Sequence, residues 1–197
     1  MRIVSGLLIA AALLCTAAVQ TDAAPKKKSR NYYEDRGEIV WEVPNEEKVI
    51  ALTFDDGPDP EDTPAILDLL KQYEAKATFF VVGKRVEAYP GLVKREIEEG
   101  HELANHTYSH SYFRGNSSGE IIENELLRTE RLIQDATGQR THLFRPPGGF
   151  YSEQVVEASK KAGYLVVMWS WHQDTEDWNT PGVGKIVKKV LKNARNG

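Results

Sequence analysis

Residues 49–58 read Val-Ile-Ala-Leu-Thr-Phe-Asp-Asp-Gly-Pro, an apolar and partly β-branched run that ends in two carboxylates and turn residues. Such a run, bounded by turn residues, is typical of a buried β-strand. Thr63 and Pro64 then supply an N-cap and a first-turn proline, and apolar residues recur behind them at helical spacing. This stretch therefore predicts a strand followed by a helix.

The alternation of strand and helix continues along the rest of the sequence. The helix that follows Ser117 opens with a capping box and stops at Gly138. Repeated strand-helix units predict an α/β fold with a mainly parallel sheet, either open or curled toward a barrel. Further strands are expected over residues 77–82, 102–104, 142–144 and 164–171, and the last helix over residues 183–193.

The 197 residues, 41% of them hydrophobic and 27% charged, suit one soluble domain. Residues 1–24 resemble a signal peptide, because Arg2 is followed by an apolar run and small residues. The run is shorter than the roughly 20 residues of a membrane span. We therefore expect no stable membrane span, a secreted and possibly wall-associated protein, a linker or lead-in over residues 25–47, and a folded domain over residues 48–197.

Charge and cysteine content exclude several classes of function. A net charge of −4 argues against nucleic acid as the main partner. The short basic run over residues 26–30 is typical of a solvated tail. Cys15, the single cysteine, lies inside the predicted signal peptide, so disulfides and thiolate catalysis are not expected in the mature protein. We expect a monomer.

Two motifs that follow predicted strands carry metal-binding residue types. Asp55 and Asp56 are neighbours, so one can bind a metal while the other stays free, although Asp-Asp-Gly-Pro is also good turn chemistry. His106 and His110 are four residues apart, which on a helical turn places both imidazoles on one face. Together with Asp56 they form a His-His-carboxylate set that suits zinc and leaves open positions for water and substrate.

Further polar and aromatic residues follow the later strands. In Arg145-Pro146-Pro147-Gly148-Gly149 the guanidinium can hold a carboxylate and the Gly148 N–H can face an oxyanion, or the segment is a plain turn. Asp177 lies beside Trp178, and Trp178 and Tyr151 offer flat apolar faces to a sugar ring. Because ligands gather at the carboxyl ends of parallel strands, these groups are expected to converge.

Thr-Phe-Asp-Asp-Gly-Pro, Asn-His-Thr-Tyr-Ser-His, Arg-Pro-Pro-Gly-Gly and Asp-Trp, in this order, resemble the motifs of the polysaccharide deacetylase family. This family is the NodB homology domain of carbohydrate esterase family 4. The resemblance implies a distorted (β/α) barrel. It also implies a set of site residues: Asp56, His106 and His110 as metal ligands, Asp55 as general base, Arg145 holding that base, and the Gly148 N–H in the oxyanion hole. Apart from the resemblance, we expect Pro147, Tyr151 and Trp178 to bind the substrate.

The resemblance also predicts a departure from the family pattern. The family's last motif, an apolar strand ending in Leu-x-His, supplies the general acid and is expected just after Gly197, where the given sequence stops. We therefore expect the C-terminal strand to be lacking. Asp177 resembles the residue that orients that histidine, and His172 is the alternative acid by position.

Three functions remain open from the sequence. The first is a Zn²⁺-dependent hydrolase that removes N-acetyl groups from N-acetylglucosamine units of a cell-wall polysaccharide, with peptidoglycan as the main expectation and chitin oligomers next. The second is a truncated, non-catalytic glycan-binding homologue. The third is an O-acetyl esterase of the xylan type, which uses the same residues.

Overall fold

The computed structural model describes residues 28–170 and 174–196, so the predicted signal peptide and His172 lie outside the described residues. Its centre is one six-stranded sheet in which all neighbouring strands are parallel. The strands are β1 (Ile39–Val40), β2 (Thr53–Gly57), β3 (Thr78–Val81), β4 (Glu102–Asn105), β5 (Leu143–Phe144) and β6 (Leu165–Val167). Their order is β1-β6-β5-β4-β3-β2, so β1 and β2 are the edges of the described sheet.

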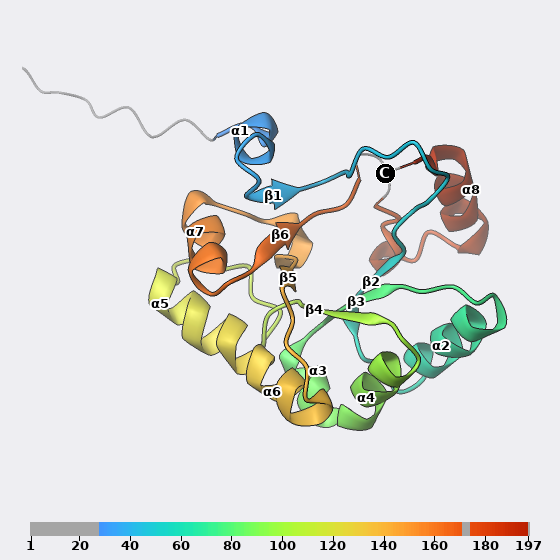
Figure 1. Ribbon diagram of the computed structural model, residues 1–197, viewed down its shortest axis with the longest axis horizontal. Coiled ribbons are helices and arrows are strands. Elements are labelled where there is room, and N and C mark those ends of the chain that lie inside the picture. Colours follow the sequence, from blue (N-terminus) through green and yellow to red (C-terminus); the bar gives the residue numbers. More distant parts are fainter. Residues whose placement is uncertain (1–27, 171–173, 197) are drawn as a thin grey trace, which may run out of the picture.

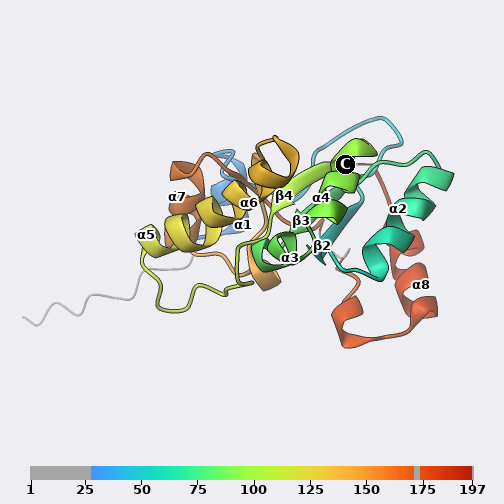
Figure 2. The same ribbon diagram turned by 90° about the horizontal axis from the view of Figure 1, so that it is seen from below.

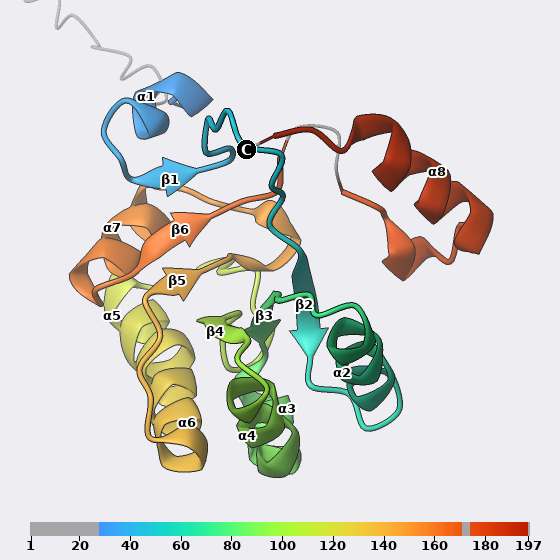
Figure 3. The same cartoon turned by 45° about the vertical axis from the view of Figure 1, so that its right-hand side comes forward.

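Helices connect the strands and lie along one side of the curled sheet (Figure 3). They are α1 (Arg30–Glu34), α2 (Asp62–Gln72), α3 (Gly83–Ala88), α4 (Pro90–Glu98), α5 (Ser118–Glu120), the π-helical segment η1 (Ile121–Leu127), α6 (Arg128–Thr137), the 3-10 turn η2 (Pro147–Gly149), α7 (Glu153–Lys161), the 3-10 turn η3 (Asp177–Asn179) and α8 (Val183–Asn193). Seen from below, α3 and α4 stand in front of the middle of the sheet, and α2 lies to the right of β2 (Figure 2). The predicted parallel α/β fold is confirmed.

The central strands β3 and β4 are buried on both faces from their second residue onward. Phe79 and Phe80 are neighbours in β3 and are 2% and 0% exposed. Phe79 packs into the cluster with Leu67 and Val93 of α2 and α4. Because successive side chains of a strand alternate, Phe80 points to the inner side, where the Arg145 guanidinium lies 3.9 Å from its ring centroid. Arg145, one of the predicted site residues, therefore lies on the inner face of the curled sheet, against Phe80.

The segment before residue 48 differs from the linker that the sequence predicts. Ile39 pairs with Val166 of β6 and is 1% exposed. Tyr33 of α1 and Trp41 are also buried in the same apolar cluster. Figure 1 shows α1 beside β1. The apolar residues are too sparse among polar neighbours to give a strand pattern, but they complete the edge of the sheet, so the folded unit begins upstream of Lys48.

The local signals of helix ends agree with the structure in part. Ser117 caps α5 in a capping box with Glu120, and Gly138 ends α6 in the left-handed conformation, as predicted. Thr63 differs from its predicted N-cap role. Helix α2 already begins at Asp62, and the Thr63 hydroxyl accepts a hydrogen bond from the Asp59 N–H at 2.8 Å.

The strand ends also differ from the predicted ranges. Strand β2 starts at Thr53 because Val49 and Ile50, 46% and 53% exposed, lie before its pairing with β3. Helix α8 has the predicted bounds, but none of its residues is buried, and it lies at the periphery in Figure 3. No helix in the described ranges is long and apolar enough to cross a membrane.

Helix α4 buries a carboxyl group that lacks any partner. Glu96 is 0% exposed, and neither of its side-chain oxygens has a hydrogen-bond partner in the part of the chain that the structure describes. Desolvation raises the pKa of Glu96 from 4.5 to about 8. The folded protein therefore keeps this side chain protonated at neutral pH.

We expect Glu96→Gln to stabilise the protein at pH 8 and to have little effect near pH 4. A raised folded-state pKa gives stability that is present below the unfolded pKa of 4.5 and is lost as pH rises toward about 8. The loss is about 1.4 kcal/mol per pH unit in that window. Urea unfolding across pH measures it, and Glu98→Gln at an exposed position of α4 is the control. A parallel pH profile for Glu96→Gln and the unsubstituted protein would contradict the assignment.

Candidate metal centre and active site

Asp56, His106 and His110 meet at the carboxyl ends of β2 and β4. The Asp56 Oδ1 lies 3.3 Å from the Nε2 of His106 and 3.1 Å from the Nε2 of His110. One donor atom from each residue lies within 4.8 Å of the others. The structure thus brings together the three ligands that the sequence predicts.

The hydrogen bonds around these residues suit a metal ion between them. The Nδ1 of His106 lies 2.7 Å from the Arg145 carbonyl oxygen. Since a carbonyl only accepts, Nδ1 carries a proton, and Nε2 is the ring nitrogen that faces the Asp56 carboxylate. Two acceptors at 3.3 Å repel each other unless a proton or a metal ion lies between them. One carboxylate and two imidazoles suit a divalent metal of the zinc type.

The contacts between Asp56 and the two histidines shift the pKa values of Asp56 and His110 so that both charged forms are favoured. Hydrogen bonding to His106, and then to His110, holds the pKa of Asp56 well below its usual range. The hydrogen bond to Asp56 raises the pKa of His110. The side chains are 2% exposed for His106, 34% for His110 and 57% for Asp56. His106 therefore anchors the cluster in the protein interior, while Asp56 and His110 leave it open to solvent, where water and substrate can enter.

A β-bulge directs Asp55 and Asp56 to different partners. Asp55 pairs with Phe80 and Gly57 with Val81, so Asp56 is the extra residue of β2. Its φ is +66°, a conformation that aspartate adopts more readily than most residues. Bulges re-aim side chains beside active sites. The adjacent carboxylates can therefore take separate roles, as predicted.

The two histidines lie on a loop rather than on the helical turn that their spacing suggests. His106 directly follows β4, and both Thr107 and His110 have positive φ, 71° and 59°. The buried Asn105 side chain accepts a hydrogen bond from the Thr107 N–H at 2.9 Å. The helical-turn prediction is wrong because these left-handed residues turn the chain back, but the ring centroids are still 5.2 Å apart.

The buried Arg145 side chain forms an ion pair with Asp55. Its Nη1 donates to the Asp55 Oδ1 at 2.7 Å and to the Thr53 hydroxyl at 2.9 Å, and its Nε donates to the Val167 carbonyl at 3.1 Å. The Arg145 side chain is 2% exposed, and burial lowers its pKa from the ordinary value, against the opposing effect of Asp55. An arginine remains charged despite this shift. The ion pair fixes the Asp55 carboxylate beside the metal ligands.

The loop after Arg145 bends sharply at two glycines. Gly148 and Gly149 have φ values of +60° and +66°. The Gly149 N–H donates to the Pro146 carbonyl and the Phe150 N–H to the Pro147 carbonyl. Among the described residues, the Gly148 N–H donates to no backbone carbonyl. It therefore stays available as the oxyanion donor that the sequence predicts.

The structure does not gather the remaining predicted residues around the metal cluster. Tyr151 packs against Tyr33 and Trp41, with ring centroids 5.5 and 5.7 Å apart, in the apolar core. Asp177 and Trp178 lie in η3, where Trp178 is 76% exposed and Asp177 accepts from the Thr175 hydroxyl. Within the described ranges, neither contacts the cluster. Pro147, in the same turn as the two glycines, is buried, and the roles of these residues stay predictions.

The sequence analysis does not predict a role for Glu125, whose side chain accepts hydrogen bonds from the loop between His106 and His110, here called the histidine loop. This residue lies in η1, and its carboxylate accepts hydrogen bonds from the Tyr108 N–H at 2.9 Å, the Ser109 N–H at 2.8 Å and the Ser109 hydroxyl at 2.7 Å. The segment it holds lies between His106 and His110. No local motif marks Glu125, since its partners are distant in sequence.

We expect Glu125→Gln to weaken metal binding by about 10- to 100-fold, the usual effect of losing a group that orients metal ligands. An amide carries no charge, so its oxygen accepts more weakly from the Tyr108 and Ser109 N–H groups, and its NH2 group replaces the oxygen that accepts from the Ser109 hydroxyl. Competition with a chromophoric chelator measures the dissociation constant. The matched control is Glu123→Gln in the same segment, where the side chain is 64% exposed. Equal metal affinity in both variants would contradict this role.

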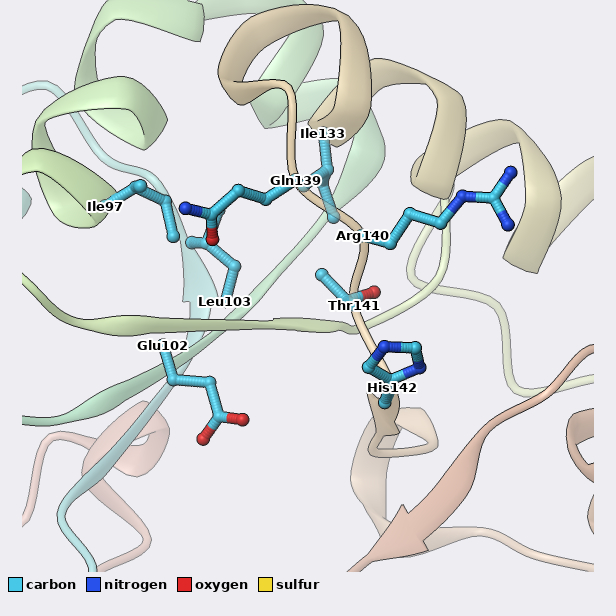
Figure 4. A pocket seen from close by; sticks show the side chains of 8 residues that line it. All are labelled: Ile97, Glu102, Leu103, Ile133, Gln139, Arg140, Thr141 and His142. Atoms are coloured by element: carbon cyan, nitrogen blue, oxygen red, sulfur yellow. The ribbon is translucent and has the colours of Figure 1, made fainter.

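A small cavity of about 130 Å³ lies at the opposite end of the strands (Figure 4). Glu102 begins β4 and His142 immediately precedes β5, so this cavity opens at the amino ends of the strands. Active groups of parallel sheets gather at the carboxyl ends. We therefore assign the chemistry to the metal cluster. The cavity is lined by Ile97, Glu102, Leu103, Ile133, Gln139, Arg140, Thr141 and His142.

Comparison with known proteins agrees with this geometry. A family model described as polysaccharide deacetylase matches residues 42–167. The chain is 52% identical over 168 residues to a peptidoglycan-N-acetylglucosamine deacetylase of Bacillus cereus, a match that covers 85% of this chain and 78% of that protein. It is 44% identical over 160 residues to the peptidoglycan-N-acetylglucosamine deacetylase PgdA of Listeria monocytogenes. That match covers 80% of this chain but only 33% of the Listeria protein.

The fold also matches solved structures. The crystal structure of the Bc1960 peptidoglycan N-acetylglucosamine deacetylase superimposes on this structure with a TM-score of 0.79, at 35% sequence identity. The match covers 86% of this chain and 78% of that chain. The similarity therefore extends over most of the sheet and over the site described above.

Proposed function

Because the chain belongs to the polysaccharide deacetylase family, we propose that it is a metal-dependent hydrolase of N-acetylglucosamine units in a cell-wall polysaccharide. Peptidoglycan is the proposed substrate, with chitin oligomers as the second choice, and the products are acetate and the free amine. The observation that carries the proposal is the Asp56-His106-His110 cluster beside a carboxylate, Asp55, that is paired to a buried arginine. The names of the relatives in Bacillus and Listeria support the choice of peptidoglycan.

Each residue of the site has a defined task in this proposal. The metal, which we propose to be Zn²⁺, supplies when bound a Lewis acid and a water of lowered pKa. Asp55 accepts the proton of the attacking water on its carboxylate. Arg145 orients that carboxylate through its 2.7 Å hydrogen bond. The Gly148 N–H donates to the oxyanion that develops on the acetamide oxygen.

The leaving amine must gain a proton as the C–N bond breaks. We propose that a histidine donates this proton, either the histidine of the Leu-x-His motif, which Asp177 would orient, or His172. We also propose that the protein acts outside the cytoplasm, where peptidoglycan lies. The predicted signal peptide supports this location, although residues 1–24 lie outside the described residues.

Acetate release from a substrate panel tests the function. The panel holds acetylated peptidoglycan, N-acetylglucosamine oligomers and acetylated xylan, each incubated with Zn²⁺-loaded protein and with its Asp55→Asn variant. We expect release from the first two substrates by the unsubstituted protein. Release from xylan alone would favour the esterase, and glycan binding without any release would favour the non-catalytic homologue. Either result would overturn the proposed amide hydrolysis.

A further inference from the structure

Two exposed aromatic rings adjoin the metal cluster. The Tyr112 ring centroid lies 5.6 Å from that of His110, and the Phe150 ring centroid lies 5.4 Å from that of Tyr112. The two residues are 46% and 57% exposed. They come from the loops that follow β4 and β5, which are neighbouring strands. The aromatic surface thus starts at a metal ligand and runs outward from it.

The surrounding chain holds Tyr112 outward. The next residue, Phe113, is buried, has a φ of +57° and packs against Phe144 of β5 with ring centroids 6.3 Å apart. The Phe113 N–H donates to the Ser111 hydroxyl at 3.1 Å. Because Phe113 anchors the loop in the core, the neighbouring ring of Tyr112 is left on the surface.

The Tyr112 and Phe150 rings occupy space that is free because Gly148 has no side chain. A Cβ atom at this position would lie 2.8 Å from the Tyr112 Cε1 and 3.0 Å from the Phe150 Cδ2. Both distances are too short for any side chain to be accommodated without displacing the rings. The rings therefore pack against Gly148, the residue whose N–H we propose as the oxyanion donor.

We propose that Tyr112 and Phe150 form a stacking platform for the sugar rings of the glycan, beginning at the unit whose acetamide meets the metal. Sugar rings have one apolar C–H face and polar edges, which suits an exposed aromatic ring that is next to polar groups. Exposed apolar surface on a soluble protein commonly marks a binding site. Tyr112 contacts the unit next to His110, and Phe150 contacts the unit beyond it. This inference rests on the proposed function and adds to it the residues that select glycan length.

Steady-state kinetics with Tyr112→Ala and Phe150→Ala test the platform on N-acetylglucosamine oligomers of two and six units. We expect KM for the hexamer to rise by about 2- to 10-fold for each ring removed, the range that aromatic contacts give. The change in KM should exceed the change in kcat and should be smaller for the dimer in Phe150→Ala. The conservative variants Tyr112→Phe and Phe150→Tyr should restore most of the affinity. Tyr73→Ala, at a ring 73% exposed on the C-cap of α2, is the control.

A second measurement separates this inference from the proposed function. Calorimetry with the hexamer and the Asp55→Asn background should show the same loss of affinity when either ring is removed, without any turnover. An unchanged KM and binding constant, with acetate release intact in the parent protein, would overturn the platform alone. A fall in kcat together with weaker metal binding would also overturn it, because the rings would then act on His110 and not on the glycan. A parent protein that releases no acetate from any substrate would instead overturn the proposed function.

Discussion

Replacing Asp55 by asparagine lowers kcat for acetate release by about 10²- to 10⁴-fold, the usual contribution of a general base. The amide has nearly the same shape but cannot accept the proton of the attacking water. Asp55 is not one of the three clustered donors, so the variant should still bind metal. Acetate release at saturating substrate measures the effect, and metal content measured in parallel shows that the ligands are intact.

The same substitution leaves the buried guanidinium of Arg145 without its counter-charge. Removing one member of a buried ion pair costs about 3–5 kcal/mol in other proteins, although the asparagine oxygen still accepts one hydrogen bond. The assay temperature must therefore lie below the unfolding transition of the variant, which circular dichroism establishes. Asp59→Asn is the matched control, since Asp59 pairs with Arg85 at 3.2 Å on the surface. If folded, metal-loaded Asp55→Asn kept activity within tenfold of the parent, another group would have to be the base.

The fold could be predicted from the sequence where local signals are strong. The β3 strand is a continuous apolar run, and α5 and α6 carry a capping box and a terminal glycine, so each element is specified by its own residues. Strand β1 could not be predicted, because its two residues are defined by pairing with β6 at the far end of the chain. A strand that depends on a distant partner leaves little pattern in its own segment.

In the site too, some features could be predicted from the local sequence, whereas others depend on residues that are distant in the chain. Asp56 and His106 were predictable as partners because Asp56 lies at the end of β2 and His106 directly follows β4, and the carboxyl ends of parallel strands meet at one edge of the sheet. The conformation of the histidine loop was not predictable, since Glu125 holds it from a helical segment further along the chain. Tyr112 has no motif either. Its place beside His110 depends on Phe113 being buried and on the space left at Gly148.

Removing one metal ligand should abolish activity and the stabilisation by metal together. His110→Ala is the sharpest variant, because its side chain is 34% exposed and its loss disturbs the core less than that of His106, which is 2% exposed. We expect Zn²⁺ affinity to fall by more than about 100-fold, beyond what loss of an orienting partner costs. Acetate release should fall to the level of chelator-treated protein, and added Zn²⁺ should restore only the parent.

Metal-dependent unfolding gives a readout of this ligand that does not depend on turnover. A ligand present at 100 times its dissociation constant stabilises the folded state by about 2.7 kcal/mol. The parent should therefore melt at a higher temperature with Zn²⁺ than with chelator, whereas His110→Ala should melt at the same temperature in both. His142→Ala, at an exposed position beside the cavity at the amino ends of the strands, is the control and should retain the shift. A parent protein shown by elemental analysis to be metal-free, yet still releasing acetate at the full rate, would contradict the assignment of Asp56, His106 and His110 as the catalytic metal site.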